Sequence, residues 1–270
     1  MTRSTAPRKG CWIILLAFLC ACAQVPITGR TRLDLVPDET ILATSYQQYE
    51  QFLEQERILR DTPESRMVQR VGERISKAVE KFMAEEGMAD EVRGYEWEFN
   101  LAAGQEVNAW AMPGGKVAVY EGLLPVTRDE TGLAVVMGHE IAHVIAKHGN
   151  ERMSQALITQ LGGVALATAL AQRPETTRQL WMAAFGLGAQ VGLLLPYSRL
   201  HEREADRLGM IFMAMAGYDP RAAVGVWERM AEQRQAPQAL EFLSTHPSDE
   251  TRLEGIKEFL PEALEYYRPR

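Results

Sequence analysis

Two histidines, His139 and His143, stand four residues apart in an otherwise apolar stretch that begins at Leu133. On a helix, residues at this spacing lie on one face, so both imidazoles can reach a single metal ion. Glu140 directly follows the first histidine and would lie beside the open coordination position, where it can exchange a proton with an attacking water. Burial of these polar side chains without a partner is costly, and a metal ion removes that cost. The pattern predicts a hydrolytic metal site on a helix.

A third protein ligand is needed, and the sequence limits the choice to a carboxylate. All three cysteines precede residue 23, and residue 149, where a longer histidine motif would place its third histidine, is a glycine. Glu202 and Asp206 share one helix face, so Glu202 is predicted to bind the ion while Asp206 accepts the free N–H of a ligand histidine. Glu204, about 160° away on the same helix, is the weaker candidate.

Two further histidines are interpreted as non-catalytic. His148 follows His139 by nine residues, about 180° round the helix, and is predicted to be a cation at the C-terminal end of that helix. His201 is predicted to face solvent beside Glu202.

The N-terminus resembles the signal of a bacterial lipoprotein. Basic residues precede an apolar run over 12–19 that is too short to span a bilayer. The following Leu-Cys-Ala-Cys resembles a lipobox, in which Cys22 fits better than Cys20 because the small Ala21 precedes it. We therefore expect a signal peptide over 1–21 and lipidation of Cys22.

Residues 22–37 contain Pro26, Gly29 and Pro37 as chain breakers and are predicted to be an extended, lipidated tether. Ala23 follows the cysteine at a position where aspartate would resemble an inner-membrane retention signal. The expected location is therefore the outer membrane of a Gram-negative bacterium, with the protein facing the periplasm and held by its lipid anchor.

Strands and a helical hairpin flank the histidine helix. Apolar and polar residues alternate from Tyr95 to Asn100, and two more strands are predicted over 107–112 and 116–121. Two apolar segments, 156–171 and 180–195, are each roughly 24 Å long as helices, shorter than the roughly 30 Å hydrocarbon core of a bilayer. They are predicted to form a hairpin, inserted over 156–195 between the two metal-ligand helices, that covers the cleft or touches a bilayer.

Four motifs in this order resemble the HtpX and CAAX prenyl protease type of zinc metalloprotease. They are the histidine motif His139–His143, the segment Asn108–Leu123, the segment Ser198–Asp206, and Thr245-His246-Pro247 followed by Arg252. The resemblance covers roughly residues 60–260 and points to the small periplasmic lipoprotein members. It implies a predominantly helical α+β, gluzincin-type fold over 38–270, with a small β-sheet edge beside the active helix. It also implies one zinc ion per chain, bound in part by Glu202, and endopeptidase activity.

An extended substrate can add to an exposed strand edge through backbone hydrogen bonds. Residues 107–112 are the predicted edge, with Asn108 and Ala109 nearest the metal. His246 and Arg252 are the remaining polar candidates. They would stabilise the oxyanion at the scissile carbonyl, or His246 would occupy the open zinc position and keep the enzyme latent. A surface or helix-capping role for His246 is the third interpretation.

The predicted function is a zinc-dependent endopeptidase of the bacterial envelope, in which Glu140 is the general base and then the general acid. Its expected partners are unfolded or misfolded envelope proteins, together with outer-membrane assembly machinery. The alternative is a periplasmic chaperone or assembly factor for outer-membrane proteins, with latent or secondary proteolysis. The formal net charge of −7 excludes the basic footprint of a nucleic-acid-binding protein.

Overall fold

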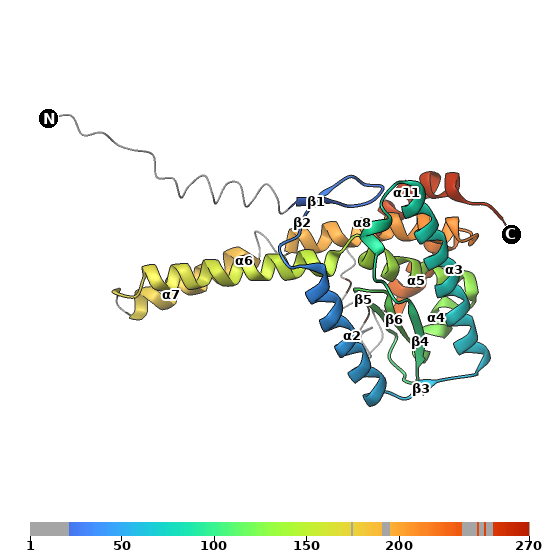
Figure 1. Ribbon diagram of the computed structural model, residues 1–270, viewed down its shortest axis with the longest axis horizontal. Helices are drawn as coiled ribbons and strands as arrows, with labels where there is room; N and C mark the ends of the chain where they lie inside the picture. The colour runs from blue at the N-terminus through green and yellow to red at the C-terminus, as the bar shows by residue number, and fades with distance from the viewer. Residues whose placement is uncertain are drawn as a thin grey trace.

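The computed structural model describes residues 22–173, 175–190, 195–233, 242, 246 and 251–269. The predicted signal peptide over 1–21 lies outside these residues. In the described part, helices surround one buried helix, and a small mixed sheet lies beside it (Figure 1). The predicted predominantly helical α+β class is confirmed.

The strands are β1 (Cys22–Gln24), β2 (Thr31–Leu33), β3 (Ile58–Leu59), β4 (Glu98–Ala102), β5 (Ala109–Met112) and β6 (Lys116–Tyr120). The α-helices are α2 (Asp38–Gln55), α3 (Pro63–Glu85), α4 (Leu124–Thr127), α5 (Glu130–Ile145), α6 (His148–Ala169), α7 (Glu175–Ala189), α8 (Leu195–Met215), α9 (Ala222–Gln233) and α11 (Arg252–Tyr266). Two short 3-10 helices are η1 (Ala89–Val92) and η2 (Glu121–Leu123).

The main sheet has the strand order β3-β4-β6-β5, in which only β4 and β6 are parallel. The strand β5 therefore lies at one edge, paired with β6 alone within the described residues. Gly114 and Gly115, between β5 and β6, both have positive φ angles, which side-chain-bearing residues rarely adopt. The two strands predicted around this turn are confirmed, whereas the strand predicted from Tyr95 begins at Glu98.

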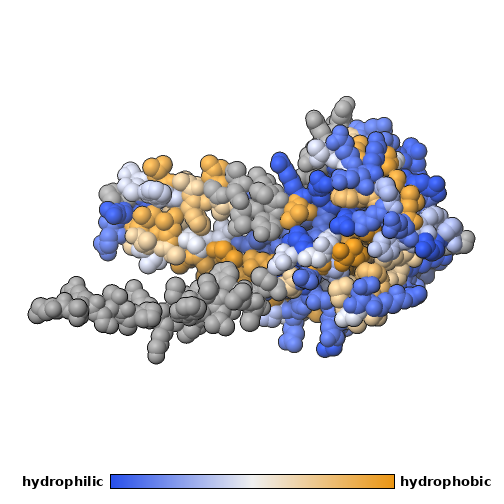
Figure 2. Space-filling model, turned by 90° about the horizontal axis from the view of Figure 1, so that it is seen from above, coloured by the Kyte–Doolittle hydropathy of each residue, from blue (hydrophilic) through white to orange (hydrophobic). Residues whose placement is uncertain are grey.

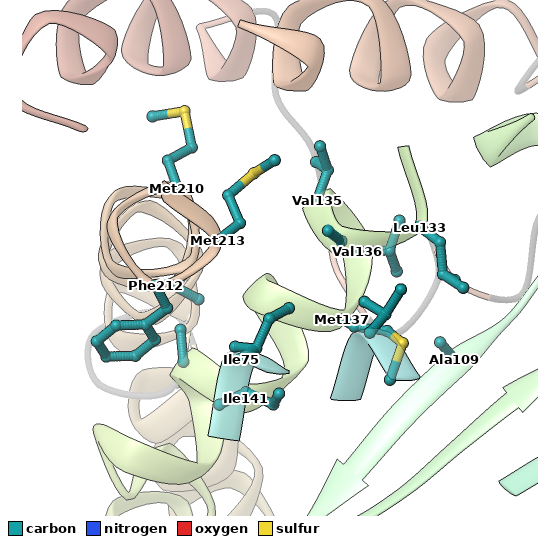
Figure 3. Close-up of a cluster of buried hydrophobic side chains, with 14 of the residues drawn as sticks. Ile75, Ala109, Leu133, Val135, Val136, Met137, Ile141, Met210, Phe212 and Met213 are labelled. Atoms are coloured by element: carbon teal, nitrogen blue, oxygen red, sulfur yellow. The ribbon is translucent and has the colours of Figure 1, made fainter. Parts of the chain in front are cut away.

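Helix α5 lies at the centre of the protein. It begins after Asp129, whose side chain accepts a hydrogen bond from the N–H of Gly132 at 2.8 Å. Every residue from Gly132 to Ile145 is buried, because α3, α8, α9 and β5 surround the helix. Figure 3 shows part of this core, in which apolar residues of α5 pack among those of α3, α8 and β5. The helix that carries the histidine motif is therefore held on all sides.

Two glycines allow α5 and α8 to cross closely. A Cβ atom added to Gly209 would lie 2.7 Å from the backbone nitrogen of His139, and one added to Gly138 would lie 2.7 Å from the carbonyl oxygen of Gly209. No side chain fits at either position without a shift of the backbone. The crossing therefore places the first histidine directly against α8.

The N-terminal residues fold back on the protein instead of forming the predicted extended tether. The strands β1 and β2 pair in an antiparallel hairpin, which we call the N-terminal hairpin (residues 22–33). Its second strand packs against α6, where the backbone N–H of Leu33 donates to Glu151 at 3.3 Å. Just beyond it, the N–H of Leu35 donates to Ser154 at 2.9 Å. Polar groups of α6 thus bind a segment that composition alone marks as a linker.

Helices α6 and α7 pack on each other and extend away from the core around α5 (Figure 1). Apolar side chains gather on this extension (Figure 2). Its large exposed hydrophobic residues are Met153, Leu157, Leu161, Val164, Leu180, Trp181 and Leu187. Among the described helices, none combines the length and the apolar character needed to cross a membrane.

Candidate metal centre

Four buried side chains from separate parts of the chain converge beside α5. His139 and His143 come from α5, Glu202 comes from α8, and His246 follows α9. Each offers one metal-ligand atom, and the four atoms lie within 4.8 Å of one another. We call these four residues the metal cluster.

The distances within the metal cluster fit a tetrahedral ion. Nε2 of His139 lies 3.1 Å from Nε2 of His143 and 3.3 Å from Nδ1 of His246. The carboxylate oxygens of Glu202 lie 3.3 Å from each α5 imidazole and 3.2 Å from His246. Four donors at about 2.0 Å from a zinc ion in tetrahedral geometry are about 3.3 Å apart. The residues therefore fit zinc.

Asp206 lies behind His139, on the side away from the metal cluster. Its Oδ1 is 2.9 Å from Nδ1 of His139 and accepts a hydrogen bond from Nη2 of Arg252 at 2.7 Å. A proton held on Nδ1 leaves the lone pair of Nε2 directed into the cluster. Arg252 also lies over the ring of Trp227, 3.5 Å from its centroid, so this guanidinium is held in place against Asp206.

His148 lies in a different place from the one predicted. Its Nδ1 is 2.8 Å from Nδ1 of His143, and the residue is fully buried. Helix α5 ends at Ile145, and Lys147 has the left-handed backbone conformation, with φ of 54°. The chain therefore turns before His148, which begins α6. The angle of about 180° assumed a single continuous helix, and for this reason the prediction was wrong.

His201 is also buried, contrary to the prediction that it faces solvent. Its Nε2 lies 2.9 Å from Glu151 of α6, and its ring stacks on His148 with centroids 4.2 Å apart. Glu204 is buried as well, against Arg30 of the N-terminal hairpin. We call Arg30, His148, Glu151, His201 and Glu204 the rear network.

A sequence signal for the rear network does exist. His201 and Glu204 are three residues apart and share one face of α8, while Glu202 and Asp206 occupy another. The spacing marks a second group of ionisable residues on α8, although such residues on a helix face more often contact solvent. The sequence does not reveal which segments cover the second face.

Glu140 has an incompletely paired carboxylate. The residue is 2% exposed, and its Oε1 has no hydrogen-bond partner among the described residues, although Nε2 of His246 lies 3.4 Å away. Burial raises the pKa of Glu140, because the charged form is poorly solvated there. A carboxylate with a raised pKa and a free oxygen can both accept and return a proton.

Electrostatics prepare two of the ligands for a metal ion. Burial lowers the pKa of His143 well below its usual value, so its imidazole is neutral. Burial alone would raise the pKa of Glu202, but the imidazoles of His143, His139 and His246 hold it far below its usual range. Burial alone would lower the pKa of His139, but hydrogen bonds to Asp206 and Glu202 raise it to about 9, so zinc binding at neutral pH must displace a proton from this imidazole.

The predicted substrate residues lie at the start of the edge strand β5. Asn108 is buried, and its Oδ1 has no hydrogen-bond partner within the described part of the chain; Ala109 is fully buried in the core. The carbonyl of Val107 accepts a hydrogen bond from the N–H of Phe242 at 3.4 Å, and the ring of Phe242 stacks on His246. The segment just before the edge strand is thus linked to the metal cluster through Phe242.

Comparison with known proteins agrees with this geometry. Residues 69–260 match the model of Peptidase family M48. The chain belongs to peptidase family M48. The predicted class of enzyme, a metalloendopeptidase, is therefore confirmed at the level of the family, whereas the narrower HtpX and CAAX prenyl protease type stays a prediction.

Individual relatives cover most of this chain. It is 38% identical over 190 residues to mitochondrial metalloendopeptidase OMA1 of Schizosaccharomyces pombe, which covers 70% of this chain and 53% of the relative. It is 30% identical over 244 residues to the human mitochondrial metalloendopeptidase OMA1, with 88% and 46% covered. It is 31% identical over 169 residues to the beta-barrel assembly-enhancing protease of Yersinia pestis, with 60% and 34% covered. The chain spans about half the length of these mitochondrial relatives.

The relatives overturn the predicted location. The yeast and human proteins are named as mitochondrial proteins of eukaryotes, which contradicts an outer-membrane lipoprotein that faces the periplasm of a Gram-negative bacterium. The composition of the N-terminus is shared by several kinds of targeting segment. A lipobox is a short motif, so it can also occur by chance without directing lipidation. Lipidation of Cys22 stays an untested prediction.

Proposed function

We propose that this protein is a zinc-dependent endopeptidase that cleaves extended segments of unfolded or misfolded proteins. One observation carries the proposal: the metal-ligand atoms of His139, His143 and Glu202 converge with His246, and the unpaired Oε1 of Glu140 lies 3.4 Å from Nε2 of His246. A site that only bound zinc for structural reasons has no use for this carboxylate.

The protein's own residues have distinct tasks in the proposed reaction. When bound, zinc supplies Lewis acidity at the scissile carbonyl and at water. Glu140 removes a proton from the attacking water and returns it to the leaving amine. Asp206 keeps the imidazole of His139 in one tautomer, and Arg252, which donates to Asp206, holds that carboxylate in position. We therefore interpret Arg252 as a positioning residue.

The proposed substrate lies along β5 as an added strand. The edge of β5 supplies backbone groups without any demand on the substrate's sequence, which suits unfolded chains. Asn108 precedes this edge and has a buried oxygen that can accept an N–H from the substrate backbone. Ala109 is fully buried, so it contributes through its backbone.

His246 supports a latent resting state. Catalytic zinc sites keep one coordination position open, whereas four protein donors close the site. Nδ1 of His246 lies 3.3 Å from His139 and 3.2 Å from Glu202, which is where the fourth donor of a closed site would lie. Cleavage would then require His246 to leave this position.

The names of bacterial relatives bear on the substrate class. The protein of Yersinia pestis is named a beta-barrel assembly-enhancing protease. We extend to this chain a substrate class of proteins that have failed to assemble. The second candidate function, assistance of assembly without cleavage, is favoured only by the closed arrangement around His246.

The test compares the full chain with its Glu140→Gln variant, using casein as an unfolded substrate and measuring bound zinc in both. We expect one zinc per chain in both proteins and a loss of cleavage of at least about 100-fold in the variant. His246→Ala should raise basal cleavage if that residue keeps the enzyme latent. Zinc in all three proteins without cleavage in any would favour the assembly function. Absence of zinc from the unaltered chain would refute the site.

A further inference from the structure

The rear network contacts the metal cluster through the side chain of His148. Nδ1 of His143 is 2.8 Å from Nδ1 of His148, and Nε2 of His148 is 3.0 Å from Oε2 of Glu204. All three residues are buried. Both ring nitrogens of His148 are therefore engaged, one with a predicted metal ligand and one with a carboxylate.

Hydrogen-bond chemistry gives this chain of contacts one direction. If His143 binds metal through the lone pair of Nε2, its Nδ1 carries the proton and donates to Nδ1 of His148. His148 must then carry its own proton on Nε2, from which it donates to Glu204. Each bond fixes the tautomer of the next ring, so the orientation of His143 depends on Glu204.

Glu204 is in turn held by the N-terminal hairpin. Nη2 and Nε of Arg30 lie 2.8 and 2.9 Å from Oε2 of Glu204, and the hydroxyl of Thr28 donates to its Oε1. The same guanidinium donates to both oxygens of Glu151, at 2.8 and 3.1 Å. Burial alone would raise the pKa of Glu151, but hydrogen bonds from His201 and Arg30 lower it to about 2.

We propose that Arg30, Glu204 and His148 are positioning residues of the metal centre, so that the N-terminal hairpin is a structural part of the zinc site. The proposal rests on the zinc site proposed above. Arg30 lies outside residues 69–260, the part that matches the family, so the matched segment alone lacks this support. Arg30 supplies the donors that hold Glu204 in place behind His148.

The hairpin contains a matched control residue. Arg32 is two residues from Arg30 and is 1% exposed. Its guanidinium donates to the carbonyl of Gln24 at 2.8 Å and to Glu91 at 2.7 Å, and no described contact joins it to the rear network. Replacement of Arg32 therefore removes these two contacts while leaving the guanidinium of Arg30 and its bonds to Glu204 in place.

The experiment measures zinc affinity by competition with a chromogenic chelator, in the full chain and in four variants. They are Arg30→Ala, Arg30→Lys, His148→Phe and Arg32→Ala. We expect the zinc Kd to rise about 10- to 100-fold in His148→Phe and about tenfold in Arg30→Ala. Arg30→Lys, which keeps the charge, should lie between Arg30→Ala and the unaltered chain. Arg32→Ala should lower the melting temperature of the metal-free protein but leave the Kd unchanged.

A second readout separates positioning from general packing. The visible absorption spectrum of the Co²⁺-loaded protein reports ligand geometry, and it should change in Arg30→Ala and His148→Phe but not in Arg32→Ala. An unchanged Kd and spectrum in the first two variants would overturn the proposal, as would an equal loss of affinity in Arg32→Ala. If Arg30→Ala does not fold, Arg30→Lys and His148→Phe decide the result. Failure of the unaltered chain to bind zinc would instead refute the zinc site itself.

Discussion

The metal cluster and the rear network are both buried groups of histidines and carboxylates. They differ in whether each hydrogen-bond acceptor faces a donor. In the metal cluster, imidazole nitrogens and carboxylate oxygens face one another at 3.1 to 3.3 Å. In the rear network, each carboxylate faces a donor, which is either a histidine N–H or the guanidinium of Arg30. Residue types and burial are alike in the two regions, whereas the supply of protons and positive charge is not.

This difference bears on which of the two polar clusters is suited to a metal ion. Buried charges are tolerated when they are paired, and Arg30 is the cation built into the rear network. The metal cluster has acceptors that converge on a common centre; its cation, Arg252, donates to Asp206 at 2.7 Å and lies 3.5 Å from Glu202. The converging acceptors suit a metal ion, whereas the carboxylates of the rear network are already paired with Arg30.

The largest expected effect comes from two matched substitutions on α8. Glu202→Gln removes the charged donor of the metal cluster and should weaken zinc binding more than about 100-fold, beyond the usual effect of a residue that only supports a ligand. Glu204→Gln removes one of the two carboxylates of the rear network and should weaken zinc binding by about tenfold. Zinc titration of both variants checks the order. Equal losses of zinc affinity in the two variants would contradict the view that Glu202 binds the ion while Glu204 only supports a ligand.

A change at the crossing of α5 and α8 should disturb both regions at once. In Gly209→Ala the new Cβ would lie 2.7 Å from the backbone nitrogen of His139, so the helices must separate. We expect the free energy of unfolding to fall by about 1–3 kcal/mol, together with a loss of zinc affinity. Urea denaturation and zinc titration measure the two effects.

Gly186→Ala, in α7, is the control for this substitution. No atom lies within 4 Å of the Cβ that it adds. It should be neutral or stabilise the protein by about 0.5–1 kcal/mol, because alanine favours helices. A loss of stability similar to that of Gly209→Ala would mean that the close crossing is not the cause.

The smallest effect concerns a partly exposed carboxylate that, like those of the rear network, is paired with arginine. Burial alone would raise the pKa of Glu130, but hydrogen bonds from Arg70, Tyr218 and Arg74 lower it from 4.5 to about 2. A folded-state pKa below the unfolded value means that ionised Glu130 stabilises the fold at neutral pH. This contribution is lost as the pH falls from about 4.5 to about 2.

Glu130→Gln should therefore lower the free energy of unfolding at pH 7 by less than about 1 kcal/mol, since the group is partly exposed. The difference from the unaltered chain should shrink steadily as the pH falls below 4.5 towards the folded-state pKa of about 2. Urea denaturation across this pH range measures it. Glu73→Gln, which breaks only an exposed pair with Lys77, should show no such dependence. A difference that stays the same from pH 7 down to pH 2 would contradict the assignment.

Features that depend on a single helix could be predicted from the sequence. The spacing of His139 and His143 and the common face of Glu202 and Asp206 follow from helical periodicity, and the structure places these four residues together. The turn between β5 and β6 could likewise be located from its glycines. Helical periodicity gave the wrong position for His148 because the helix ends before this residue. The left-handed residue that turns the chain there is not marked by any apolar pattern.

By itself, the sequence determined the class of this protein: a helical motif of histidines and a glutamate, with a carboxylate on a second helix, specifies a hydrolytic metal site because local backbone geometry sets which side chains share a face. Only the tertiary structure decided what surrounds that site. His246 comes from 107 residues beyond His139, and Arg30 contacts a glutamate 174 residues away. Such contacts depend on how helices cross and where segments fold back, and residue spacing carries no information about either.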